Sequence, residues 1–272
     1  PPLGGKTTGY SNAPVTDGIH DPITAQIVIL QTAQQSIAVA ICDLCIFNST
    51  WLHEQVRALG IDHFLLANTH THAGPSMRQD DFPSPKKPWR RTVEERILAA
   101  VIEAQKGLFQ AQFTVSTGEL QLGYNRLVRQ PEGHAVTHFD NPERIPYGPV
   151  DPTVTVMRLT DETGDVRLVL VSYACHPVVL GPKNSKISAG FPGVLREMIE
   201  DKLGGEAKCV FLQGGAGDIN PLILPRSEDP QEDFAFMKTM GTLLGDKVLA
   251  ILGKMERADD RTETLEVVSK VI

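Results

Sequence analysis

Residues 64–75 read Phe64-Leu65-Leu66-Ala67-Asn68-Thr69-His70-Thr71-His72-Ala73-Gly74-Pro75. The apolar start of this run predicts a buried strand, and Gly74-Pro75 predicts the turn that ends it. Alternate side chains of a strand share one face, so we expect His70 and His72 to point into one pocket. A His-x-His pair at a strand end is typical of zinc sites, because zinc binds neutral imidazole nitrogen. We favour metal binding over the alternative that both histidines only form hydrogen bonds within a loop.

The composition describes an ordinary globular chain of 272 residues, with 41% hydrophobic and 22% charged residues. This length suits one large α/β domain or two small ones. The net charge of −7 gives no basic surface for nucleic acid, so a nucleic-acid partner is not expected. No apolar run approaches the ~20 residues that a membrane-spanning helix needs.

Strand and helix patterns alternate along the chain. The apolar periodicity predicts strands over 23–30, 36–41, 64–67, 111–116, 153–159, 166–174, 208–212 and 264–272, and helices over 51–59, 92–110, 194–203 and 234–255. Short connections predict two hairpins, one within 23–41 and one within 153–174. The polar, Pro-rich segment 76–89 is expected to be an ordered loop over the pocket or a mobile lid. We therefore expect an α/β fold with a mixed β-sheet core covered by helices, and a metal site at the strand ends.

Cysteine usage indicates no disulfide scaffold, since the chain holds only four cysteines. Cys42-Asp43-Leu44-Cys45 has the spacing of a redox motif, but it follows a predicted strand and does not open a helix. We interpret Cys42 and Cys45 as small buried residues at a strand end.

Three predicted strands end in residues that can carry chemistry: His70 and His72, then Cys175-His176-Pro177, then the glycine-rich loop 213–221. In open α/β sheets such loops converge on one site, which is the main argument for an enzyme. His176 taken alone is better interpreted as a packed residue bonded to backbone groups. The loop lacks the Gly-Lys-Ser/Thr ending of a phosphate-binding loop, so it is expected to form a tight turn or an oxyanion-binding nest of backbone N–H groups.

Three further charged residues have more than one interpretation each. Asp43 and Asp218 follow apolar strands, so each could be a metal ligand, a partner of a histidine ligand or a turn cap. Arg126 could bind a polar or anionic substrate group in a two-pronged manner, or lie on a solvated surface.

Segments that share motifs with a known family occur in the family's order along nearly the whole chain: Pro1-Pro2-Leu3-Gly4 leading to Gly9-Tyr10, Asn68 to Pro75, Asn125-Arg126, Gly148-Pro149-Val150-Asp151-Pro152, Ala174-Cys175-His176-Pro177 and Gly214 to Pro221. The segment Asn68 to Pro75 looks like the His-Thr-His-Ser-Gly-Pro signature of the neutral (neutral/alkaline, non-lysosomal) ceramidase family. The segment Gly214 to Pro221 resembles the Gly-Asp-Val-Ser-Pro loop of that family. The resemblance implies a zinc-dependent amidase with an α/β catalytic domain, cleaving the N-acyl bond of ceramide.

The resemblance also implies roles for individual residues. His70 and His176 match the two zinc-ligand histidines of the family, and His72 matches a pocket histidine that assists proton transfer. Arg126 matches the active-site arginine of the Asn-Arg motif. Asp218 and Asn220 lie in the catalytic Gly-Asp loop and are candidate catalytic residues.

The chain departs from the family pattern in several places. Asn220 stands where ceramidases have a catalytic Ser, and Asn could orient or polarise a carbonyl but is no hydroxyl nucleophile. Gly190 stands where family members tend to have an Asp. The remaining zinc ligands of the family, a Glu and a Tyr, lie beyond the point where this chain ends, as does an immunoglobulin-like domain. Residues 1–272 are therefore expected to form one ceramidase-like catalytic domain that is incomplete at its C-terminus, with further zinc ligands outside this chain.

The expected reaction is hydrolysis of an acyl-amide or lipid substrate by zinc-activated water, whose pKa the metal lowers to about 7. His72 would move the proton, Asn220 and loop N–H groups would stabilise the oxyanion, and Arg126 would orient the substrate. One alternative is a hydrolase of a different acyl amide or ester, and another is a non-catalytic ceramidase-like binding protein. The resemblance slightly favours a secreted or periplasmic location, although the chain shows no signal peptide.

Overall fold

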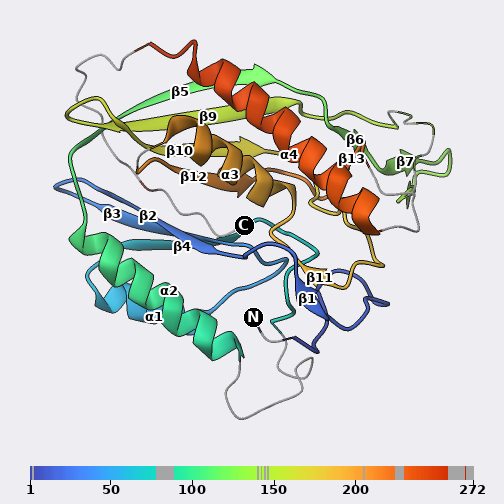
Figure 1. Cartoon of the computed structure of the whole chain (residues 1–272), viewed down its shortest axis with the longest axis horizontal. Coiled ribbons are helices and arrows are strands. Elements are labelled where there is room, and N and C mark those ends of the chain that lie inside the picture. The colour runs from blue at the N-terminus through green and yellow to red at the C-terminus, as the bar shows by residue number, and fades with distance from the viewer. Residues whose placement is uncertain are drawn as a thin grey trace.

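Two β-sheets lie side by side, each covered by its own pair of helices, as the computed structural model in Figure 1 shows. The structure describes residues 1, 3–77, 89–139, 141, 143, 145, 147–204, 206–223, 230–256 and 267. Most of the predicted strand over 264–272 and most of the predicted lid over 76–89 lie outside this set. The α/β fold class predicted from the sequence is confirmed, with mixed sheets and helices as their cover.

The larger sheet has four strands in the order β12-β10-β9-β5. Their bounds are β5 Ala111–Glu119, β9 Thr153–Asp161, β10 Val166–Tyr173 and β12 Lys208–Gln213. β9 and β10 form the predicted hairpin, while β10 and β12 are parallel. Parallel strands end at one edge of a sheet, so the segments that follow β10 and β12 emerge together.

Two helices, α3 (Phe191–Leu203) and α4 (Pro230–Leu252), cover one face of this sheet (Figure 1). The buried side chains of the sheet alternate as expected for a strand with one covered face. The core between sheet and helices includes Val154, Val156, Val169, Val171, Phe191, Leu195, Met240 and Leu244. The structure begins α3 earlier than the pattern predicted, because Pro192 fits the first helical turn.

The smaller sheet has the order β2-β3-β4, with β2 Ala25–Gln31, β3 Ser36–Cys42 and β4 His63–Asn68. β2 and β3 form the predicted hairpin, and β3 runs parallel to β4 through the crossover helix α1, Thr50–Ala58. Ser49 caps α1, because its side chain accepts a hydrogen bond from the backbone N–H of Leu52 at 3.2 Å. α1 and α2 (Trp89–Lys106) cover this sheet, whose separate core includes Ala38, Ala40, Leu52, Val56, Ile97 and Val101. The predicted helix over 92–110 thus begins and ends earlier than expected.

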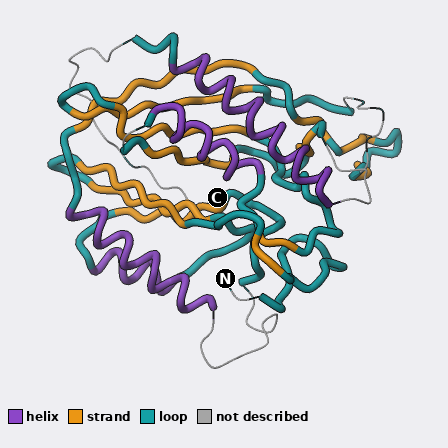
Figure 2. The backbone as a smooth tube through the Cα atoms, viewed as in Figure 1, coloured by secondary structure: helices purple, strands orange, loops and turns teal. Residues whose placement is uncertain are grey.

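The edge strand β12 of the larger sheet contacts all three strands of the smaller sheet. β12 contacts β3 and β4, and the side-chain amide of Gln26 donates a hydrogen bond to the backbone carbonyl of Cys209 at 2.7 Å. The tube view in Figure 2 shows the two groups of strands, with one pair of helices across the larger group and the other pair beside the smaller group. This contact brings the ends of β4, β10 and β12 into one region.

Short strands complete the fold, and the sequence pattern did not predict them because two or three residues carry no readable alternation. They form three pairs: β1 (Gly18–Ile19) with β11 (Lys186–Ile187), β6 (Gly123–Asn125) with β13 (Ile219–Pro221), and β7 (Leu127–Arg129) with β8 (Ala135–Thr137). The β6–β13 ribbon is the one that shapes the site. Among the described helices, none is long and apolar enough to cross a membrane.

Candidate active site

Three histidines meet where the strands end, and we call His70, His72 and His176 the histidine cluster. Their ring centroids are 5.1 Å apart for His70 and His72, 4.7 Å for His70 and His176, and 5.2 Å for His72 and His176. The predicted convergence of residues far apart in the sequence is therefore present. His70 and His72 also share a pocket as predicted, but the reason given for that pair, alternation along one strand, is wrong, because β4 ends at Asn68 and both residues lie in the segment that follows.

His70 has a backbone φ of +66°, the only positive φ of a residue other than glycine among the described residues. This left-handed conformation costs an L-residue about 1–2 kcal/mol, and such strain is common at functional sites. Its backbone N–H donates to the carbonyl of Leu44 at 3.0 Å, and its Nδ1 lies 2.7 Å from the carbonyl oxygen of Cys45. A carbonyl only accepts, so Nδ1 carries the proton and Nε2 is left with its lone pair.

His176 is oriented in the same way from the opposite side. Its backbone N–H donates to the carbonyl of Ile219 at 2.9 Å, and its Nδ1 lies 2.7 Å from the carbonyl oxygen of Ala216. Nδ1–H bonding to a backbone carbonyl is how proteins fix the tautomer of a metal-binding histidine and free its Nε2.

Both ring nitrogens of His72 are buried and have no hydrogen-bond partner within the described part of the chain. Tyr10 contacts the ring edge-on with centroids 5.0 Å apart, and Gly9 lies so close that a Cβ there would be 2.2 Å from Nδ1. A buried polar group without a hydrogen-bond partner destabilises the folded state. Native proteins keep such a group where a ligand, an ion or a water molecule serves as its partner.

Burial lowers the pKa of two of these imidazoles. The pKa of His72 falls to about 3 through burial and then through the charges of His176, His70 and Arg126. The pKa of His176 falls to about 4, again mainly through burial, although its bond to Ala216 opposes the shift. Both rings are neutral near pH 7, which is the form that binds metal.

Arg126 is held beside the cluster by the glycine-rich loop. Its Nη1 donates to Oδ1 of Asn220 at 3.1 Å, and its Nη2 donates to the carbonyl of Gly217 at 2.7 Å. Its guanidinium carbon also lies 5.1 Å from the centroid of the Phe139 ring. The planar fork of an arginine fits such multiple contacts and leaves the remaining N–H groups for a ligand.

Asn220 and Asp218 hold this arrangement from β13 and the loop before it. Asn220 is 2% exposed, and its amide donates to the hydroxyl of Tyr124 at 3.4 Å. Oδ2 of Asp218 accepts from the side-chain amide of Asn125 at 2.7 Å. The structure thus brings every predicted site residue into one region, while the chemical role of each residue remains a prediction.

Two alternatives from the sequence are decided by geometry. Asp43 is no histidine partner, because its carboxylate accepts bonds from Arg196 and Thr24. The glycine-rich loop is a tight turn, in which the N–H of Ala216 donates to the carbonyl of Gly214 at 2.8 Å. None of its three glycines has a positive φ, so the loop lacks the left-handed residue of a typical anion nest.

The site also contains residues that sequence reasoning did not assign to it. Tyr10, Tyr124 and Cys45 contact the cluster or its supports, and Cys45 is buried as predicted. Burial raises the pKa of the Cys45 thiol to about 12. The ligand atoms of Cys45, His70 and His72 lie within 4.8 Å of one another, the one such group of metal-binding side chains found in the described residues.

The donor set therefore fits a transition metal. Neutral imidazoles with fixed tautomers and a nearby sulfur match the ligands of zinc, and the two ring nitrogens of His72 have no partner among the residues that the structure describes. The structure thus contains donors at the strand ends suited to a metal.

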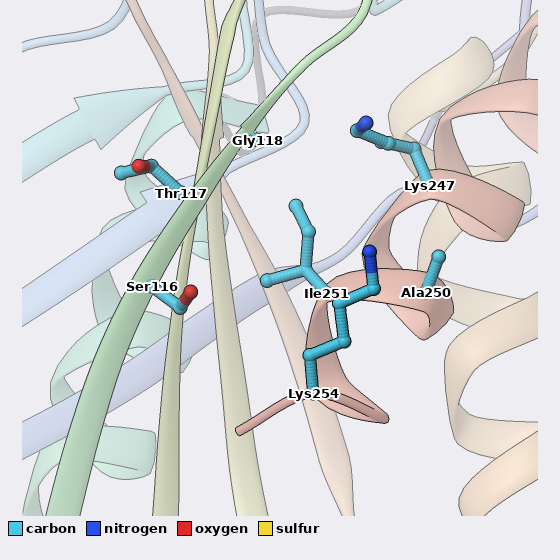
Figure 3. A pocket seen from close by; sticks show the side chains of 7 residues that line it. All are labelled: Ser116, Thr117, Gly118, Lys247, Ala250, Ile251 and Lys254. Carbon is cyan, nitrogen blue, oxygen red and sulfur yellow. The ribbon is translucent and has the colours of Figure 1, made fainter. Parts of the chain in front are cut away.

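A second hollow lies elsewhere, between β5 and α4, and holds no histidine or cysteine. Figure 3 shows that Ser116, Thr117 and Gly118 of β5 line one side, while Lys247, Ala250, Ile251 and Lys254 line the other. Its volume is about 100 Å³. It shares no residue with the histidine cluster and supplies no group to the chemistry proposed below.

Comparison with solved structures defines the class of fold. The chain has the α/β fold of the ceramidases, as the sequence resemblance implied. One structure, neutral ceramidase from Pseudomonas aeruginosa, superposes with a TM-score of 0.74 at 21% sequence identity, covering 93% of this chain and 42% of that one. A second, described as ceramidase complexed with C2, gives a TM-score of 0.73 at 20% identity with the same coverage.

The chain thus spans less than half the length of the ceramidase structures that it resembles. No protein-family model matches the sequence, and no curated protein matches it either. The similarity therefore establishes the fold.

Proposed function

We propose that this chain is the catalytic part of a metal-dependent hydrolase of the ceramidase type, which cleaves the N-acyl amide bond of a ceramide-like lipid. The observation that carries the proposal is the histidine cluster beside Arg126, built at the strand ends of a ceramidase fold. The fold alone would fit many activities, so the proposal depends on the site.

We infer that zinc is the metal. The residues that would hold it are His70 and His176 through Nε2, with His72 and Cys45 close by. When bound, a zinc ion supplies Lewis acidity and makes water acidic enough to serve as a nucleophile near neutral pH.

The residues of the chain supply the remaining functions. His72 is neutral, is oriented by Gly9 and Tyr10, and has ring nitrogens without a hydrogen-bond partner in the described part of the chain, so it can accept a proton and pass it to the leaving amine. Arg126 binds the substrate through the N–H groups that Gly217 and Asn220 leave free. Asn220 acts by holding Arg126, because its amide oxygen is already the acceptor for that guanidinium.

The arrangement of the site supports the proposed substrate class. A neutral, mostly buried site with one arginine suits an uncharged amide with adjacent hydroxyl groups better than it suits a phosphate ester, which would require more positive charge. A role in sphingolipid metabolism and a secreted or periplasmic location are part of this proposal.

The direct test measures hydrolysis of an N-acyl sphingosine and, beside it, of short N-acyl amides and esters. We expect amide hydrolysis that is lost on chelation and restored by zinc, and a large loss of activity in Arg126→Lys with unchanged zinc content. Lys keeps the charge but cannot contact Asn220 and Gly217 together. Preferential hydrolysis of the ester set would favour the alternative substrate class, and a zinc-loaded protein with no hydrolysis of either set would contradict the proposed function.

A further inference from the structure

We infer that Gln213 is a positioning residue that sets the separation of His70 and His176. It is the last residue of β12, and its side-chain amide bonds to the residue before each of these two histidines. The inference rests on the proposed function and deepens it, because it names the side chain that holds the two proposed zinc ligands at their spacing.

The amide group of Gln213 makes three hydrogen bonds to the backbone. Its Nε2 donates to the carbonyl of Thr69 at 3.1 Å and to the carbonyl of Cys175 at 3.0 Å. Its Oε1 accepts from the N–H of Cys175 at 3.3 Å. A glutamine amide has two N–H donors and one carbonyl acceptor, so all three groups are in use. Because backbone carbonyls only accept, these bonds also fix which way the amide faces.

The backbone groups that the amide holds are deeply buried. Thr69 and Cys175 are both 0% exposed, so loss of the amide would leave buried carbonyl groups without these partners. Thr69 is also held on its other side, where its N–H donates to the carbonyl of Cys42 at 2.9 Å. The amide therefore joins two segments that come from different sheets, one after β4 and the other after β10.

The position of each histidine depends on these two anchoring residues. His70 and His176 follow them directly in the chain, and the ring centroids of the two histidines are 4.7 Å apart. The geometry of a peptide bond is fixed, so a shift in either anchoring residue moves the imidazole attached to the next one. A direct backbone bond between the two segments, from the N–H of His72 to the carbonyl of Pro177, is 3.4 Å long and thus weaker than the bonds donated by the amide.

Glutamine combines the donors, the acceptor and the reach that this position requires. Glutamate has the same length, but its carboxylate has no N–H donor and would face two carbonyl oxygens. Methionine has a similar volume and makes none of the three bonds. Asparagine keeps both donors and the acceptor, but it is one methylene shorter and cannot bond to both segments from the end of β12. Substitutions by methionine and asparagine therefore test the bonds and the reach separately.

The first measurement is the Zn²⁺ affinity of the 272-residue chain, determined by competition with a chelator. We expect Gln213→Met to bind Zn²⁺ about 10–100-fold more weakly, the usual loss when a group that orients a metal ligand is removed. Gln26→Met is the matched control, because it removes another bond between the two sheets, from a glutamine side chain to the backbone carbonyl of Cys209 at 2.7 Å. The control should keep its affinity for Zn²⁺, even if its free energy of unfolding falls as far as that of Gln213→Met.

Hydrogen exchange of the metal-free chain gives an answer that requires neither metal nor activity. The backbone N–H groups of His70 and His176 donate to carbonyls that none of these substitutions alters. We expect both amides to exchange faster in Gln213→Met and in Gln213→Asn, because the segments that carry them are no longer held together. In Gln26→Met both amides should exchange at the wild-type rate.

Wild-type Zn²⁺ affinity in Gln213→Met, together with wild-type exchange at His70 and His176, would overturn the role of Gln213 and leave the proposed hydrolase standing. If Gln213→Met does not fold, Gln213→Asn carries the same comparison, since it keeps a polar group beside the buried carbonyls. A wild-type chain that binds no Zn²⁺ would contradict the proposed function, and the exchange rates would still decide whether Gln213 holds the two segments together.

Discussion

Arg196 and Asp43 form a buried two-pronged ion pair, with Nη1 to Oδ1 at 2.8 Å and Nη2 to Oδ2 at 2.7 Å. Asp43 is 1% exposed and follows β3, while Arg196 is 7% exposed and belongs to α3. Oδ2 of Asp43 also accepts bonds from the backbone N–H and the hydroxyl of Thr24. The pair joins the helix of the larger sheet to the segment of the smaller sheet that carries Cys45.

Breaking this pair should destabilise the whole chain. We expect Asp43→Asn to lower the free energy of unfolding by about 3–5 kcal/mol, because it leaves the guanidinium buried without its counter-charge. Denaturant unfolding of the metal-free protein measures the loss. The control is Lys106→Ala, which removes an exposed pair with Glu103 and should change little. A loss below 1 kcal/mol for Asp43→Asn would show that the pair contributes little to stability.

The left-handed backbone of His70 predicts a difference between two variants that both lack the imidazole. We expect metal-free His70→Gly to be more stable than His70→Ala by about 1 kcal/mol, since glycine adopts a φ of +66° without the clash of a Cβ. Both variants should lose metal binding to a similar extent. Equal stability of the two would mean that the backbone relaxes when the imidazole is removed.

Gly9 is expected to be essential for the position of His72. Gly9→Ala would place a Cβ 2.2 Å from Nδ1 of that ring, so we expect the ring to move and metal affinity to fall at least about 10-fold. Gly133→Ala is the matched control, because Gly133 also has a positive φ (+88°) but no atom within 4 Å of the added Cβ. The control should lose stability through backbone strain alone and keep its affinity for Zn²⁺, as measured by competition with a chelator.

The depressed pKa values of His72 and His176 make the metal-free protein sensitive to acid. Their pKa values in the folded chain, about 3 and about 4, lie below the ordinary value of 6.5 that applies to the unfolded chain. Between pH 3 and pH 6.5 the unfolded chain therefore binds more protons than the folded chain. The free energy of unfolding should therefore fall as the pH falls from about 6.5 towards 3. Denaturant unfolding at a series of pH values measures this slope, and His72→Gln should make it shallower. If His72→Gln leaves the slope unchanged, other titratable groups cause the pH dependence of stability.

Local sequence patterns predicted the long elements and the residues that end them. The β2–β3 and β9–β10 hairpins, α1 and α4 all carry periodicity that survives into the structure, because burial of one face is what each pattern encodes. The convergence of His70 and His176 was predicted from the ends of their strands. The very short strands were not predicted, because they form only where segments distant in the sequence pair with each other.

The inner geometry of the site depends on contacts that no local pattern contains. His70 and His72 share a pocket because the segment after β4 turns at His70, which has a left-handed backbone. Strand alternation predicted the shared pocket correctly, but the two residues do not lie on a strand. Cys45 was predicted to be buried, and it is, but its approach to His70 depends on the register between β3 and β4. A CxxC after a strand beside a His-x-His after the next parallel strand is a signal that could have found it.

The β6–β13 ribbon places Arg126 and Asn220 on one rigid unit, because Tyr124 pairs with Asn220 and Asn125 with Ile219. The β7–β8 hairpin, Leu127–Thr137, follows this unit directly along the chain. Insertions and deletions there can reshape the mouth of the site without altering the distance between the guanidinium and its anchoring amide. Descendants of this sequence can therefore diverge in the molecules they admit while the machinery beneath stays constant.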